Sequence, residues 1–165
     1  MRNIGRGKEL RALVEAAVAA GVASTLIQLL LWSAFSGASP WLLLSRDARL
    51  TAAIIMGRTV LPPSATFGPV VWLIAAFIHS MLSIVYAVIV AYPASRFGSA
   101  ASMVIGSGAG VMIYFVNLYG FTEIFPWFVQ TRGWITLVAH VAFGVALAGT
   151  YTALCKYRRR SIRRS

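Results

Sequence analysis

Four long stretches without a charged residue dominate this sequence. They cover residues 16–45, 59–95, 97–122 and 133–155, with lengths of 30, 37, 26 and 23 residues. Each exceeds the roughly 20 apolar residues that an α-helix needs to cross the hydrocarbon core of a bilayer. Soluble domains are about one quarter charged, whereas 12% of this chain is charged and 59% is hydrophobic. These stretches predict an integral membrane protein.

Transmembrane helices fit the stretches better than barrel strands do. Barrel strands alternate apolar and polar residues in segments of about ten, and these stretches are continuously apolar. We therefore predict an all-α four-helix membrane bundle, with spans at about 12–35, 67–92, 99–121 and 133–155. The first stretch is too long for the apolar part of a signal peptide, so we expect an uncleaved span. A single transmembrane domain then covers residues 1–165.

The basic residues predict the orientation of the bundle. Eleven of the fifteen lie in the tails, 1–11 and 156–165, or at Arg96, and the outer connections hold only Arg46, Arg49, Arg58 and Arg132. Lys and Arg concentrate in short cytoplasmic segments. This asymmetry predicts that both termini are cytoplasmic in a bacterial inner membrane. The net charge of +11 thus indicates contact of the tails with anionic lipid headgroups, and no nucleic-acid partner is expected.

The tryptophans support the same orientation. Indole rings favour the membrane–water interface, and all five fall at the predicted outer ends of the spans. We expect them to act as interface anchors: Trp32, Trp41, Trp72, Trp127 and Trp134.

The first outer connection contains a further predicted helix. Ser45 is a suitable cap for a short helix over residues 47–57, in which Leu50, Ala53, Ile54 and Gly57 share one face. We expect this helix to lie in the outer interface. Three prolines, Pro62, Pro63 and Pro69, should then break the chain before the second span.

The two halves of the chain resemble each other when the Pro-Trp pairs at residues 40–41 and 126–127 are aligned. In each half a helix is followed by the Pro-Trp pair and then by a helix that carries one histidine, His79 or His140. Both halves begin on the cytoplasmic side, which predicts two similar hairpins in a parallel repeat.

These two histidines are the only ionisable side chains deep in the predicted spans. Ionisable groups in a membrane usually face the protein interior. Helical spacing adds further polar groups, so that the candidate polar band is His79, His140, Ser83, Tyr86, Tyr114, Asn117 and Gln28. Such a band could carry a small solute or protons, or it could simply hydrogen-bond between helices. A third interpretation is a redox anchor in which the histidines bind haem b from opposite faces.

Gly106 and Gly110 form a Gly-x-x-x-Gly pattern in the third span. This pattern permits close helix packing, either inside the bundle or in a homo-oligomer or with a membrane partner protein. No carboxylate pair, Cys/His set or metal-ligand spacing occurs within the spans, so we predict no enzyme, no catalytic or metal-binding residue and no resident cofactor.

Several of these segments resemble a known family. The stretch from His79 to Ala87, the Gly106/Gly110 helix, the segment from Gly120 to Trp127, and His140 with Phe143 are similar to the YagU-type bacterial inner-membrane proteins over roughly residues 70–155. The resemblance implies a small multi-pass inner-membrane protein, and the family has no assigned biochemical activity to transfer. An accessory or structural role is therefore the first hypothesis, with the solute or proton pathway and the haem anchor as alternatives.

Overall fold

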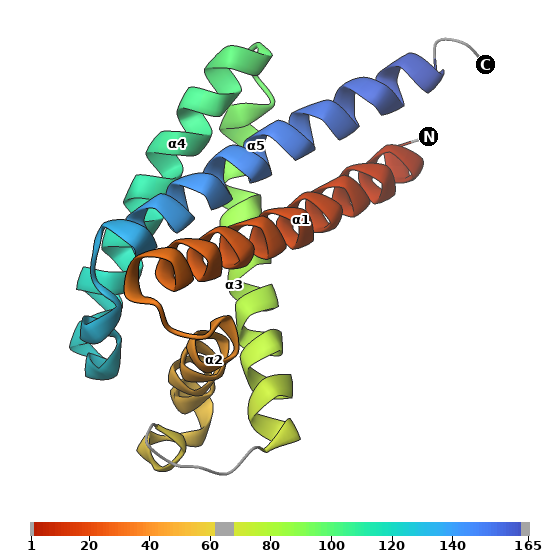
Figure 1. The fold of residues 1–165 in the computed structure, drawn as a ribbon. Coiled ribbons are helices and arrows are strands. Elements are labelled where there is room, and N and C mark those ends of the chain that lie inside the picture. The colour runs from red at the N-terminus through yellow and green to blue at the C-terminus, as the bar shows by residue number, and fades with distance from the viewer. Residues whose placement is uncertain (1, 62–67, 163–165) are drawn as a thin grey trace.

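Helices form along all four apolar stretches. The computed structural model describes residues 2–61 and 68–162, and within them it shows a bundle of helices (Figure 1). Four helical segments are long and apolar enough to cross a membrane: Glu9–Ser36, Pro69–Ala94, Ser99–Glu123 and Trp134–Tyr157. The prediction of an all-α bundle with four spans is confirmed. Pro62 and Pro63 lie outside the described residues, as do the side chains of residues 1–6, 8 and 158–165, which hold most of the predicted basic tails.

The elements follow one another with short connections. The chain forms, in order, α1 (Arg2–Ser36), α2 (Pro40–Met56), η1 (Arg58–Val60), α3 (Pro69–Ala94), α4 (Ser99–Phe115), the π-helical turn η2 (Val116–Gly120), η3 (Phe121–Glu123), η4 (Pro126–Thr131) and α5 (Trp134–Ile162). Helix α5 packs most extensively against α4 and α1, whereas α3 packs mainly against α1 and α2.

The two ends of the bundle differ in composition. The start of α1 and the end of α5 lie at the same end of the bundle (Figure 1), and Lys156 near the end of α5 donates a hydrogen bond to Ser99 at the start of α4. At the opposite end, the ring of Trp134 packs edge-on against Phe35 with centroids 4.9 Å apart. All five tryptophans belong to segments of this second end, which we call the tryptophan end.

Glycines set the distance between α4 and α5. A Cβ atom on Gly110 would lie 2.3 Å from the backbone oxygen of His140, and one on Gly106 would lie 2.4 Å from that of Gly144. Real Cβ atoms do not approach backbone oxygens so closely. The two glycines of the Gly-x-x-x-Gly pattern therefore face α5 within the same chain, where small residues let the backbones meet.

Helix α2 begins earlier than the sequence suggested. It starts at Pro40, with Ser39 in the extended conformation before it, because proline has the φ angle of a first helical residue and needs no hydrogen-bond donor there. Ser45 lies inside the helix and does not begin it. Gly37 and Gly57 bracket α2 with φ angles of 67° and 76°, values that favour glycine.

Small side chains close the bundle between the termini and its middle. Alanines on α1 let it pack tightly on α3 and α5. The buried cluster consists of Ala16, Ala17, Ala20, Ala87, Val90, Ile113, Phe143 and Leu147.

Candidate binding site

An open cavity of about 570 Å³ occupies the half of the bundle that carries the tryptophans. Its walls come from the second half of α1, one face of α2, the first two thirds of α3, the end of α4 with η2, and the start of α5. This volume lies in the range of small-molecule sites, roughly 300–1,000 Å³. Helix α3 packs on α2 and contacts α4 and α5 much less extensively than those two helices contact each other.

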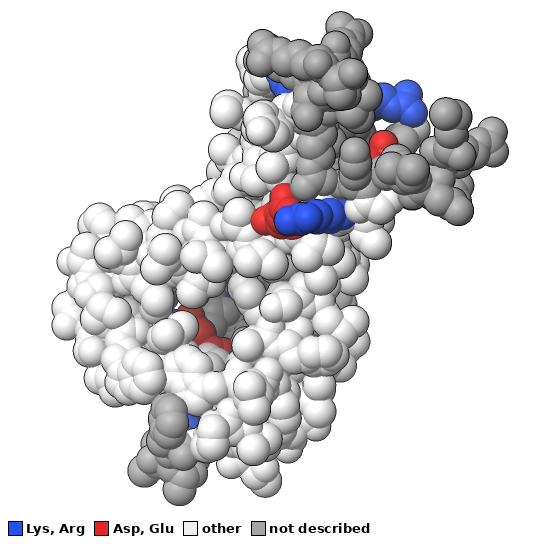
Figure 2. Space-filling model, turned by 90° about the vertical axis from the view of Figure 1, so that its right-hand side faces the viewer, with Lys and Arg blue, Asp and Glu red and all other residues white. Residues whose placement is uncertain are grey.

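The cavity opens on the surface of the protein. Figure 2 shows a hollow in a largely uncharged face, with acidic atoms visible inside it. Of the four acidic residues in the chain, only Asp47 lines the cavity among the described residues. A carboxylate is therefore accessible from outside at the wall of an otherwise apolar space.

Six of the seven predicted polar-band residues line this one cavity. Gln28 comes from α1, three from α3, Asn117 from η2 and His140 from α5. The exception is Tyr114, which is buried behind the site. Its ring contacts His140 edge-on at 5.8 Å, and its hydroxyl accepts a hydrogen bond from the backbone of Gly133.

A chain of hydrogen bonds joins three elements across the cavity wall. The Tyr86 hydroxyl donates to Oδ1 of Asn117, and Nδ2 of Asn117 lies 3.4 Å from Nε2 of His140. Nδ1 of His140 lies 2.8 Å from the carbonyl oxygen of Thr136. Because a carbonyl only accepts, Nδ1 carries the proton and Nε2 accepts from Asn117. This arrangement assigns a neutral imidazole of defined tautomer.

The π-helical turn η2 brings Asn117 into this chain, and Arg132 supports the turn. π-Bulges shift the register of a helix and are frequent at functional sites. Nε of Arg132 donates to the carbonyl of Leu118 at 2.7 Å, and Nη2 donates to Thr122 at 2.8 Å. The guanidinium also lies 4.3 Å from the ring centre of Tyr119. Arg132 thus satisfies a carbonyl that the irregular turn exposes.

Asp47 on α2 forms the opposite wall with Gln28. Nε2 of Gln28 donates to Oδ2 of Asp47 at 2.8 Å, which ties α1 to α2. The guanidinium of Arg46 contacts Oδ1 at 2.8 Å. Burial raises the pKa of Asp47 above its usual value, while the charge of Arg46 and the hydrogen bonds from Arg46 and Gln28 act in the opposite direction.

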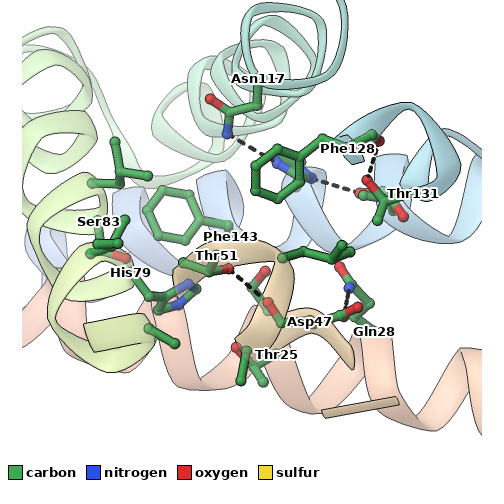
Figure 3. A pocket seen from close by; sticks show the side chains of 18 of the residues that line it. Thr25, Gln28, Asp47, Thr51, His79, Ser83, Asn117, Phe128, Thr131 and Phe143 are labelled. Atoms are coloured by element: carbon green, nitrogen blue, oxygen red, sulfur yellow. Dashed lines mark hydrogen bonds between the residues drawn. The ribbon is translucent and has the colours of Figure 1, made fainter. Parts of the chain in front are cut away.

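His79 faces the cavity from α3 and packs against α1. A Cβ atom on Gly21 would lie 3.1 Å from Nε2 of His79 and 3.2 Å from the Ser83 hydroxyl. The absence of a side chain at Gly21 therefore leaves the room that His79 occupies. Figure 3 shows His79, Thr51, Thr25 and Asp47 around the same interior space, with Asn117 on the far side.

Aromatic side chains line the cavity beside aliphatic ones, and they were not among the site residues predicted from the sequence. They include Trp72, Phe121, Phe125, Phe128 and Phe143. Trp127 does not line the cavity, but its indole donates to the carbonyl of Leu50 at 3.0 Å and holds η4 against α2. In both halves a proline at the tryptophan end starts a helix, α2 or η4, that borders the cavity.

Asp47 and Thr51 were also missed, although a signal was present. The cavity side of α2 presents residues at helical spacing, Leu44, Asp47, Ala48, Thr51 and Ile54, so Asp47 and Thr51 share a face one turn apart. The charged residues around Asp47 suggested a helix that exposes its polar face to water. Instead, α2 turns Asp47 inward, and the outward side chains of Leu42 and Ile55 are more than 60% exposed.

Within residues 2–61 and 68–162, no group of three or more His, Cys, Asp or Glu side chains is arranged to hold a metal ion.

Comparison with known proteins assigns the chain to no family, since no family model, no curated protein and no solved structure matches it. The resemblance to YagU-type proteins stays a prediction.

Proposed function

We propose that the chain is a multi-pass protein of the bacterial inner membrane that binds a small solute in the cavity at its tryptophan end. One observation carries this proposal: polar side chains from separate apolar helices converge on a single open space. Groups that only served to hold helices together would pair across a closed interface. The cavity instead keeps His79 and Asp47 accessible.

The distribution of charge supports an outward-facing site. The basic residues concentrated at the tails and at Arg96 favour the cytoplasm for the end with the termini. The tryptophan end, and with it the cavity, then faces the outer side of the inner membrane. A solute would reach the site from that side.

The packing favours binding over passage through the bundle. The cluster of small and aliphatic residues around Ala16, Ala87 and Leu147 fills the space between the cavity and the termini. The hydrogen-bond chain also ends at the carbonyl of Thr136, and a backbone carbonyl has no proton to pass on. These features argue against the alternative of a solute or proton pathway in this conformation.

Haem binding is less favoured because both ring nitrogens of His140 already have partners. A haem ligand needs a free imidazole nitrogen, whereas the chain itself engages both ring nitrogens of His140, Nδ1 through Thr136 and Nε2 through Asn117. The resemblance to YagU-type proteins supports a location in the inner membrane and an accessory role. It implies no particular ligand.

Blocking the cavity tests the proposal. Ala76 lines the cavity and is exposed, so Ala76→Phe should fill part of it. The full chain in lipid nanodiscs is titrated with 2-naphthol, a small aromatic probe, and binding is followed by energy transfer from tryptophan. We expect saturable binding that weakens at least about tenfold in Ala76→Phe. Ala101→Phe, outside the cavity lining, should bind as the parent does. Absence of saturable binding, or equal affinity in Ala76→Phe, would refute the proposal.

A further inference from the structure

Four of the seven hydroxyl groups that line the cavity share an orientation that bears on the kind of solute it takes. Thr25 donates its proton to the carbonyl of Gly21 at 2.9 Å, and Thr51 donates to the carbonyl of Asp47 at 2.8 Å. The hydroxyls of Tyr86 and Thr131 likewise donate to Asn117 and to the carbonyl of Phe128. A hydroxyl has one proton and two acceptor lone pairs. Each of these four therefore offers only lone pairs to the cavity.

Asp47 adds acceptor capacity at the same wall. A carboxylate offers about four acceptor positions. Gln28 uses one on Oδ2, and the two nitrogens of Arg46 approach Oδ1. A position on Oδ2 remains beside the lone pairs of Thr51, on the cavity side of α2. Figure 3 shows Asp47 and Thr51 next to each other, with Thr25 nearby on α1.

The negative charge of Asp47 is already paired within the wall. The guanidinium of Arg46 contacts the carboxylate of Asp47 directly, and the tryptophan end contains more arginines than acidic residues, namely Arg46, Arg49, Arg58 and Arg132 against Asp47 and Glu123. A cationic solute would approach a surplus of positive charge, and an anionic one would meet a wall of acceptors. The wall therefore suits a neutral hydrogen-bond donor.

The opposite walls suit an apolar body. Phe128 on η4 and Phe143 on α5 line the cavity together with Phe121, Phe125 and Trp72. Aromatic walls with few, fixed polar groups bind apolar rings or chains and orient one polar end.

We infer that the cavity takes a neutral amphiphile whose polar end carries a hydroxyl or amide N–H. The donor bonds to Asp47 and Thr51, and the apolar body lies against the phenylalanines. This inference rests on the proposed binding function and specifies the class of its ligand.

Two probes that differ only in the donor test this inference. 2-Naphthol and its methyl ether, 2-methoxynaphthalene, share the same rings, and only the first can donate a hydrogen bond. Both are titrated against the full chain in nanodiscs, with empty nanodiscs to subtract partition into lipid. We expect 2-naphthol to bind at least about tenfold more tightly, because the ether leaves buried acceptors without a partner.

Substitutions locate the effect. Thr51→Val keeps the shape of the side chain and removes the hydroxyl, and Asp47→Asn removes the charge, so each should reduce the preference for 2-naphthol to about threefold or less. Glu123→Gln, which makes the same change at an exposed residue outside the cavity lining, should leave the preference unchanged. A persistent preference in both cavity variants would overturn the assignment to Asp47 and Thr51.

The outcomes separate the two proposals. If both probes bind equally and Ala76→Phe weakens both, the cavity binds solutes but the donor preference is refuted. If neither probe binds, or Ala76→Phe changes nothing, the proposed function itself fails.

Discussion

Asn117 connects the helices around the cavity because a primary amide can accept and donate at the same time. Its oxygen accepts from Tyr86 on α3, and its nitrogen faces His140 on α5. A carboxylate at this position could not donate to Nε2 of His140, and a leucine could do neither. Asn117 thus complements the tautomer that the Thr136 carbonyl sets on His140, and it positions the side chain of Tyr86.

Removing the Tyr86 hydroxyl should weaken the fold without changing its shape. Tyr86→Phe leaves Oδ1 of Asn117 without its donor, and hydrogen bonds between membrane helices contribute about 0.6 kcal/mol on average and up to about 1.7. We expect a loss of about 0.5–1.5 kcal/mol in unfolding by denaturant in detergent. Tyr157→Phe, at an exposed position near the end of α5, should have no effect. Equal stability of the two variants would contradict the network.

Asp47 should make the stability depend on pH. Its pKa is raised by burial above the ordinary value of 3.8, so the folded chain holds this proton more tightly than the unfolded chain does. The free energy of unfolding then falls as the pH rises from the ordinary pKa of 3.8 through the raised pKa of Asp47. Asp47→Asn removes this contribution. We expect the thermal midpoint of the parent to fall relative to that of Asp47→Asn over this range. Parallel curves, or a parent that gains stability relative to the variant, would contradict the burial of the carboxyl.

At the scale of elements, the crossing of α4 and α5 holds the deep wall of the site. Gly110 lies against the backbone of His140, so the same contact sets the helix distance and the position of the imidazole. The sequence predicted close packing at this pattern but left open whether the partner was another helix of the chain or another protomer. Only the course of α5 places a partner opposite both glycines.

A matched pair of substitutions tests this crossing. Gly110→Ala would bring a Cβ atom to within 2.3 Å of a backbone oxygen, whereas a Cβ atom at Gly108 on the same helix meets nothing within 4 Å. Overpacking typically costs about 1–3 kcal/mol. We expect this loss in Gly110→Ala, and a neutral or slightly positive effect in Gly108→Ala because alanine favours helix formation. Similar unfolding free energies for both variants would show that the helices do not meet here.

Helix α2 marks the limit of what the sequence could predict. The sequence predicted that a helix forms here, from an apolar pattern between turn residues. It predicted neither the start of α2 at Pro40 nor the side of α2 that faces the cavity. Pro40 is equally compatible with the end of a loop and with the first residue of a helix. The three arginines near Asp47 are typical of a helix face exposed to water. The inward position depends on Gln28, nineteen residues away, a long-range contact that local patterns do not contain.

At the scale of the molecule, hydropathy and charge were sufficient for the four spans and for most of the polar band. Long apolar stretches allow only one kind of structure in a bilayer, and polar groups within them avoid lipid. The same reasoning could not distinguish a closed interface from a cavity, because that depends on how far α3 stands from α4 and α5. The aromatic residues of the cavity could not be predicted either, because phenylalanine is equally common on lipid-facing surfaces and in apolar binding sites.

Two neighbouring residues of α3 test whether water reaches the cavity from the outer side of the membrane, as the proposed function requires. Ala76 lines the cavity, whereas Phe77 is 58% exposed and outside its lining, although both have nearly the same depth. Cysteines are introduced singly at the two positions in a Cys155→Ser background, and intact spheroplasts are treated with a membrane-impermeant maleimide. We predict labelling of Ala76→Cys and none of Phe77→Cys, because thiols react as thiolates in contact with water. Equal labelling of the two, or labelling of Phe77→Cys alone, would contradict the account.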